Sequence, residues 1–153
     1  MSQNIYRLLQ LTNPSVGVVA ASAFMPFGTV TRQIKQDTDC QSTFVVATNT
    51  NNTVYVQEPG FYKITYNANL VAAAAGLVTL NLQINGTTVY TANVTATAGG
   101  TVQVAFTFMT RVFDNCCSNS ANLPIQIQIQ NNGVGLTGGG GNLIVERVAK
   151  VCC

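Results

Sequence analysis

From residue 43 onward, apolar and polar residues alternate along the chain with a period of two. In residues 78–84, Val, Leu and Ile alternate with Thr, Asn and Gln. Residues 101–108 and 125–130 repeat the pattern. Successive side chains of a β-strand point to opposite faces, so this alternation predicts strands with one buried side and one solvent-facing side.

Turn signals separate these runs. Asn85-Gly86 accepts a positive φ at both central positions of a type I′ turn, so residues 77–84 and 87–94 should form a hairpin. Other turn signals stand at residues 49–52, 59–60, 99–100 and 138–141. Further strands are predicted at residues 43–48, 53–57, 60–70, 109–113 (continuing 101–108) and 142–148. Short strands at this spacing predict an all-β sandwich or barrel.

The composition excludes several functions. Charged residues make up 8% of the 153-residue chain, whereas hydrophobic residues reach 47% and Thr, Asn and Gln number 19, 16 and 11. Seven scattered bases and a net charge of +2 provide no basic stripe for a nucleic acid. With no His and five dispersed carboxylates, we expect neither an enzyme nor a required cofactor.

Two features of the N-terminal region argue against membrane insertion and secretion. The most apolar stretch, residues 16–27, is shorter than the roughly 20 residues of a spanning helix and contains Pro26. Only Arg7 precedes it as a base, among several polar residues, which is not the pattern of a secretory signal. We therefore expect no membrane partner.

The first 36 residues are predicted to be an attachment arm with an edge strand, followed by a single domain over residues 37–153. Residues 5–11 have helix-like spacing but are too short to form a stable helix alone. Burying a few of their side chains on a partner surface could offset the entropy of ordering the arm. The predicted docking residues are Ile5, Tyr6, Leu8, Leu9 and Leu11.

Residues 58–66, with the sequence EPGFYKITY, are the most specific string in the chain. They resemble the Gly-x-Tyr strand of tumour necrosis factor-like jelly rolls, a group that includes complement heads and bacterial spore proteins. The resemblance extends over about residues 44–148. It implies an antiparallel jelly-roll sandwich that assembles as a homotrimer, and a surplus of apolar residues favours the same assembly. It also implies a trimer core made of Tyr62, Ile64, Tyr66 and Phe106.

Within this family, a chain with a short N-terminal arm and no collagen repeat is similar to trimeric head-decoration or head-fibre proteins of tailed phages. The resemblance implies a non-catalytic structural protein of the virion surface, attached to the capsid through the arm. The alternatives are a structural subunit of the spore exosporium or a spore appendage, and a tip that binds a receptor or glycan. The turns contain no aromatic residue that could stack on a sugar, which favours decoration over recognition.

The five cysteines form two doublets and a singlet: Cys40, Cys116, Cys117, Cys152 and Cys153. An odd number leaves one thiol unpaired or paired between chains. The doublets could supply four thiolates to zinc, but they lack the Cys-x₂-Cys spacing that structural zinc sites favour. Free thiols, or interchain bridges formed in an oxidising medium, are therefore the prediction. Such doublets are also found in cross-linked spore-coat proteins, which supports the spore alternative.

Overall fold

The computed structural model describes residues 6–34, 43–47, 51–112 and 124–149. The described residues contain ten strands: β1 Arg7–Asn13, β2 Thr29–Ile34, β3 Phe44–Val46, β4 Val54–Val56, β5 Gly60–Ala72, β6 Gly76–Ile84, β7 Thr87–Ala96, β8 Thr101–Val112, β9 Ile125–Asn131 and β10 Leu136–Ala149. They contain no helix, and hence none long and apolar enough to cross a membrane. The predicted all-β class is confirmed.

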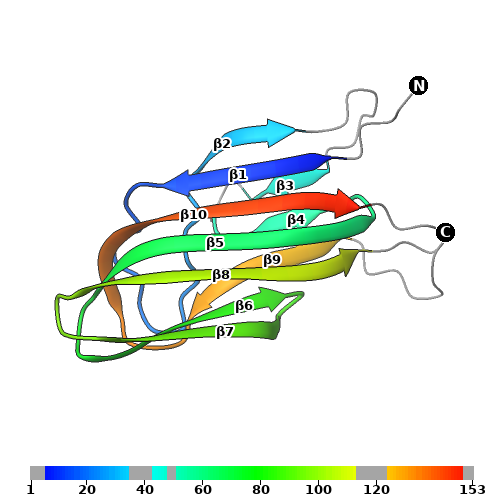
Figure 1. Cartoon of the computed structure of the whole chain (residues 1–153). Coiled ribbons are helices and arrows are strands. Elements are labelled where there is room, and N and C mark those ends of the chain that lie inside the picture. The colour runs from blue at the N-terminus through cyan, green and yellow to red at the C-terminus, as the bar shows by residue number, and fades with distance from the viewer. Residues whose placement is uncertain (1–5, 35–42, 48–50, 113–123, 150–153) are drawn as a thin grey trace, which may run out of the picture.

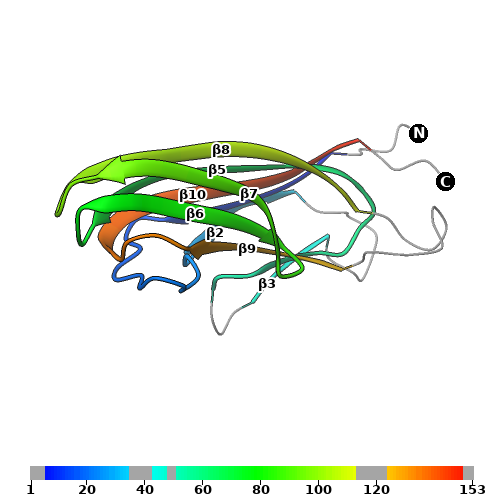
Figure 2. The ribbon, with the colours of Figure 1, turned by 90° about the horizontal axis from the view of Figure 1, so that it is seen from below.

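The strands form two five-stranded antiparallel sheets that pack face to face. Sheet A has the order β2-β1-β10-β5-β8, and sheet B has the order β3-β4-β9-β6-β7 (Figures 1 and 2). The alternating apolar side chains of both sheets meet between the layers, where residues such as Ile64, Leu80 and Ile127 are fully buried. This arrangement is the predicted jelly-roll sandwich.

The hairpin predicted at Asn85-Gly86 is confirmed. Asn85 and Gly86 have φ angles of +53° and +80°, as a type I′ turn requires. β6 and β7 pair on either side of them, with Ile84 opposite Thr87. The pairing extends beyond the predicted segments to Gly76 opposite Ala96.

The glycine run at residues 138–141 is not the turn that the sequence suggested. It lies inside β10 and pairs with the C-terminal part of β5. A Cβ atom at Gly139 would collide with the backbone carbonyl of Asn69, and one at Gly141 would lie 2.7 Å from the Tyr66 hydroxyl oxygen. Glycine therefore allows β10 to run close to β5 and to pass over a large buried ring.

The prediction of a separate N-terminal arm is wrong for the residues that the structure describes. β1 is an interior strand of sheet A, paired with β10 on one side and with β2 on the other. Leu9 and Leu11 are fully buried because they pack between the two sheets, whereas Leu8 is 7% exposed and occupies an outward position of β1. Tyr6 is 37% exposed, and Ile5 lies outside the described residues. The segment is a strand, not a helix, because its neighbours supply the hydrogen bonds and the apolar surface that it lacks alone.

Residues 14–28 leave sheet A after β1, contact strand β9 of sheet B, and return to sheet A as β2; they cover the end of the sandwich farthest from the chain ends (Figure 1). Val19 exchanges two backbone hydrogen bonds with Leu136, and the amide of Met25 donates to the carbonyl of Ile129. The side chain of Asn131, which is fully buried, donates to the carbonyl of Val19 at 3.2 Å. Val16, Val19, Met25 and Phe27 of this segment therefore enter the core of this chain, whereas Val18 is 82% exposed.

Candidate functional site

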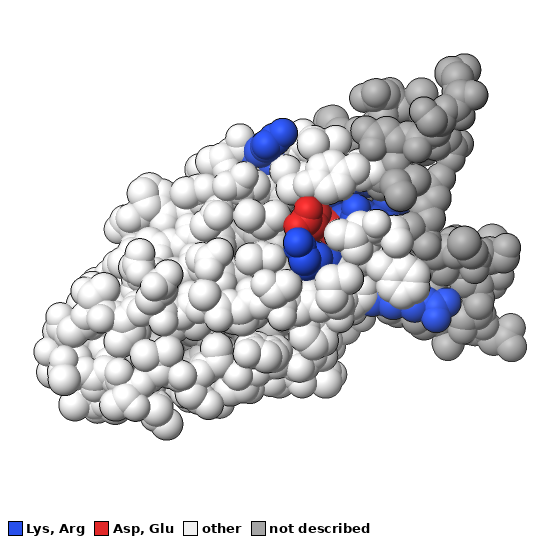
Figure 3. Space-filling model, viewed as in Figure 1, with Lys and Arg blue, Asp and Glu red and all other residues white. Residues whose placement is uncertain are grey.

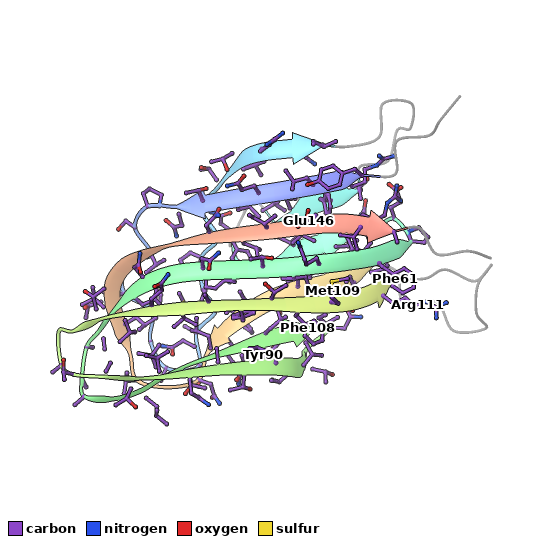
Figure 4. All side chains as sticks on the ribbon, in the orientation of Figure 1. Phe61, Tyr90, Phe108, Met109, Arg111 and Glu146 are labelled. Carbon is purple, nitrogen blue, oxygen red and sulfur yellow. The ribbon has the colours of Figure 1, made fainter. Side chains whose placement is uncertain are left out.

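A band of exposed apolar side chains crosses the half of the molecule next to the chain ends. Phe61 and Met109 lie on the outer face of sheet A and are 38% and 52% exposed. Tyr90, 41% exposed, and the half-buried Phe108 lie nearby, toward the edge where β7 and β8 face each other (Figure 4). We call Phe61, Tyr90, Phe108 and Met109 the apolar band. Its two parts lie on different sides of the sandwich, one on a face and one on an edge.

The edge part of the apolar band is continuous with the core through stacked rings. Tyr90 lies 5.2 Å from Phe106, and Phe106 lies 5.8 Å from Tyr66, measured between ring centroids. Such distances are typical of favourable aromatic contacts. The ring row fixes Tyr90 at the open edge, so this exposed ring is held in place and offers a preorganised contact.

Paired charges border the face part of the apolar band. Lys63 and Glu146 form an ion pair with a 3.1 Å nitrogen–oxygen distance, and the Tyr6 hydroxyl donates to Glu146 at 3.0 Å. Partial burial, reinforced by this hydrogen bond, raises the pKa of Tyr6. The Arg111 guanidinium lies 5.8 Å from the centre of the Phe61 ring, close enough for a cation–π contact.

A groove of about 350 Å³ lies on the same side of the molecule, toward the opposite end of sheet A. We call it the amide groove; it is lined by Thr12, Asn13, Asn67, Ala68, Asn69, Gln103, Gly140, Gly141 and Asn142. Asn67 is six residues from Phe61 on β5 and four from Lys63, which is opposite Met109. At ~3.3 Å per residue, the groove begins about 20 Å from Phe61 and about 13 Å from Met109. This half of the face carries no charged side chain among the described residues (Figure 3).

Three charged residues form a cluster inside the end of the sandwich next to the chain ends. Glu58 forms ion pairs with Arg147 and with Arg7, whose Nε lies 3.6 Å from the carboxylate. The carboxylate also accepts a 2.6 Å hydrogen bond from Thr43, and the Glu58 carbonyl accepts one from the Tyr62 hydroxyl at 2.7 Å. Burial raises the pKa of Tyr62 far above its ordinary value. The cluster links β1, β5 and β10 through ion pairs and hydrogen bonds, so its role is structural.

The four residues predicted to form a trimer core are not available as contacts between subunits. Tyr62 and Ile64 are fully buried within one chain, while Tyr66 and Phe106 are 2% and 6% exposed. The even-numbered positions of β5 and β8 point into the sandwich, so that prediction is wrong. Phe61 and Met109, which the sequence analysis missed, occupy the outward positions of the same strands.

All five cysteines lie outside the described residues, so the predicted free thiols or interchain bridges stay a prediction. Within the described residues, no three His, Cys, Asp or Glu side chains come together as a group that could hold a metal ion. The zinc alternative depends on the cysteine doublets and stays a prediction as well.

No protein-family model matches this sequence. No curated protein matches it either. Solved structures, in contrast, match its fold. The chain aligns with Eiger TNF from S. frugiperda at a TM-score of 0.62 and 9% identity, over 97% of this chain and 96% of that one. The globular domain of zebrafish complement 1qA aligns at a TM-score of 0.61 and 8% identity, over 90% of this chain and 94% of that one.

The vertex protein P5 of PRD1 aligns at a TM-score of 0.60 and 12% identity, over 95% of this chain and 99% of that one. The fold of this chain is therefore the tumour necrosis factor-like jelly roll, as the string at residues 58–66 suggested. At these identities the similarity concerns the fold, which unrelated functions share.

Proposed function

We propose that this chain is a non-catalytic structural protein that assembles as a homotrimer on the surface of a phage particle. The similarity to the vertex protein P5 supports the virion location. A structural subunit of a bacterial spore surface is the alternative location. The observation that carries the self-association is the apolar band, because large exposed apolar patches on a small domain mark interaction sites.

The position of the apolar band favours a ring of copies. Phe61 and Met109 lie on a sheet face, whereas Tyr90 lies on an edge. When the edge of one copy packs against the face of the next, the contact is heterologous, and such contacts form a closed ring if the rotation between copies allows it. A threefold ring is the assembly that the resemblance implies, and each copy would contribute both halves of every contact.

The non-catalytic part of the proposal is supported by what the described ionisable groups do. The carboxylates of Glu58 and Glu146 are both engaged in ion pairs. The Tyr6 hydroxyl donates to the Glu146 carboxylate, and the Tyr62 hydroxyl donates to the backbone carbonyl of Glu58. Among the described residues, none of these groups forms a nucleophile with an adjacent base. No cofactor is part of the proposal.

The attachment surface proposed here differs from the predicted arm, since Leu9 and Leu11 are committed to the core of the sandwich. β1 begins and β10 ends at the same end of the molecule (Figure 1). We place the contact with the capsid at this end, where Tyr6 is exposed. The three copies of a trimer would bind with avidity, because attachment of the first raises the effective concentration of the others.

Light scattering coupled to size exclusion tests the trimer directly. The full-length chain should elute with three times its 16.2 kDa mass. Tyr90→Ser with Met109→Ser should raise the dissociation constant at least tenfold, because both remove apolar area from the contact. Leu77→Ser is the matched control, since Leu77 is 51% exposed on the other sheet and should leave the mass unchanged. A stable wild-type monomer at micromolar concentration would contradict the proposal.

The location requires a separate experiment. Mass spectrometry of purified phage particles and of spores from the source organism should detect the chain in the phage particles. Its presence in spores alone would reject the virion location and leave the trimer untouched.

A further inference from the structure

We propose that the amide groove is a binding site for a neutral saccharide. This function goes beyond the structural role proposed above, because a trimer held by the apolar band does not need the groove. The inference rests on the chemistry of the side chains that line the groove, and the glycan-binding alternative in the sequence analysis did not identify this surface.

The wall of the groove carries amide side chains that have no hydrogen-bond partner in the described part of the chain. Asn67, Asn69 and Gln103 are exposed on β5 and β8, and Asn69 is directly opposite Gln103 in the strand register. Their amides accept through oxygen and donate through NH₂. A sugar hydroxyl group also donates and accepts, so these three side chains can bond to it in exchange for water, without breaking bonds within the protein.

The opposite wall is held in place by bonds within the protein. The Asn142 Oδ1 atom accepts from the side chains of Gln10 at 3.3 Å and Thr12 at 3.2 Å. These bonds occupy its oxygen and leave its NH₂ group to donate to a ligand. Asn13 has a different role, because its side chain bonds to Pro26 and Ser15 and fixes the turn after β1.

Glycines form the floor of the groove. Gly140 and Gly141 of β10 lie between the neighbouring strands β1 and β5. Gly140 has no side chain to fill the groove, and a Cβ atom there would lie 3.0 Å from the carbonyl oxygen of Asn13. Gly141 contributes backbone only, since a Cβ atom there would point into the core toward Tyr66. A volume of about 350 Å³ lies at the lower end of the range of small-molecule sites.

The absence of charge selects the class of ligand. None of the groove residues is ionisable. Arg32, an exposed cation on β2, is opposite Gln10 and stands outside the lining; the other charged side chains seen on this face lie toward the chain ends (Figure 3). Phosphate, sulfate or carboxylate groups would find no cation among the lining residues to pair with and would lose hydration. A neutral polyhydroxylated ligand loses less hydration free energy on binding, because its hydroxyl groups exchange hydrogen bonds to water for hydrogen bonds to the amide side chains.

The lining contains no aromatic ring, so a single groove should bind weakly, with a dissociation constant of about 1 mM, which corresponds to about −4 kcal/mol. If the proposed trimer forms, three such grooves on one assembly would strengthen attachment to a surface that displays many saccharides. The binding chemistry itself does not depend on the trimer.

Nuclear magnetic resonance of the ¹⁵N-labelled full chain tests the proposal. The probes are maltotriose, triacetylchitotriose and lactose, each added to millimolar concentration, with 3′-sialyllactose as the charged comparison. At least one neutral probe should shift the side-chain amide signals of Asn67, Asn69 and Gln103 in a saturable manner. Asn69→Ala with Gln103→Ala should weaken that binding at least tenfold. Gln126→Ala, which removes an amide from the outer face of sheet B, should leave it unchanged.

Light scattering on the same variants separates this proposal from the trimer. The double variant should keep the oligomeric mass of the wild type. Loss of that mass would overturn the saccharide proposal, since a neighbouring subunit would then occupy the groove. Absence of any shift with all three neutral probes, or equal binding of 3′-sialyllactose, would overturn it as well. A monomeric wild type that binds a neutral probe would support the groove while refuting the trimer.

Discussion

Replacing the buried leucines of β1 tests whether the N-terminal segment is part of the sandwich. Leu9 and Leu11 are both fully buried and both point between the sheets. Leu→Ala substitutions at such positions cost about 2–5 kcal/mol, through the lost transfer free energy and the cavity that remains. Each single variant should lose about 3 kcal/mol of unfolding free energy.

The double variant should be close to the limit of folding. Two losses of about 3 kcal/mol sum to about 6 kcal/mol, and the sum is imperfectly additive because the two side chains are neighbours on one strand face. Domains of this size have a total stability of about 5–15 kcal/mol. Leu9→Ala with Leu11→Ala should therefore be largely unfolded in mild urea.

The chain has no Trp, so far-ultraviolet circular dichroism is the suitable probe of unfolding. Urea titrations should be run at one protomer concentration and under reducing conditions, because self-association and thiol exchange both change the apparent stability. Tyr6→Ala is the control, since Tyr6 is exposed and should cost less than about 1 kcal/mol. Single leucine variants that lose less than about 0.5 kcal/mol would refute the assignment of β1 to the core and restore a detachable arm.

Three further substitutions have defined outcomes in the same urea titrations. Glu58→Gln should cost about 3–5 kcal/mol of unfolding free energy, because it removes the carboxylate that pairs with two buried guanidinium groups. Lys63→Gln, at a more exposed ion pair, should cost about 0–1 kcal/mol. Equal losses in the two variants would contradict a structural role for the Glu58 cluster. Gly139→Ala should cost about 2 kcal/mol or more, since residue 139 has a φ of +114° and a Cβ atom there would collide with the backbone of β5. Gly138→Ala is the control: a Cβ atom at residue 138 would meet no neighbouring atom, so stability should change by less than about 0.5 kcal/mol. Tyr66→Phe should be neutral or stabilise by about 1 kcal/mol, because the buried hydroxyl has no hydrogen-bond partner among the described residues; a clear loss would reveal a partner.

The alternation of residues was sufficient to predict β3 to β9, because each of these strands has one apolar and one polar face, but it predicted only the C-terminal half of β10, whose first half is a glycine run. It failed for β1, where Arg7 occupies an inward position and Leu8 an outward one, so the alternation is hidden. Arg7 is buried because Glu58, far away in the sequence, supplies its counter-charge. Local pattern cannot reveal a partner that only the fold brings into contact.

The same limit explains the errors at the candidate site. On β5, Phe61 and Tyr62 are adjacent aromatic residues on opposite faces, and the sequence does not determine which of them meets the core. The register places Tyr62 inside and Phe61 outside. The amide groove could not be predicted at all, since its lining combines residues of β1, β5, β8 and β10.

The distribution of charge accounts for the kind of surface that this chain presents. On the sheet A face, Lys63 pairs with Glu146 and Arg111 lies over Phe61 toward the chain ends, and Arg32 stands on the edge strand β2. The rest of that face is neutral and is kept hydrated by amides and hydroxyls. A net charge of +2 per chain means that copies brought together on a particle repel each other only weakly. Contacts built from apolar side chains and neutral hydrogen bonds depend little on salt, because salt screens interactions between charges. Such a surface suits a protein that is crowded with its own copies and exposed to media of changing ionic strength.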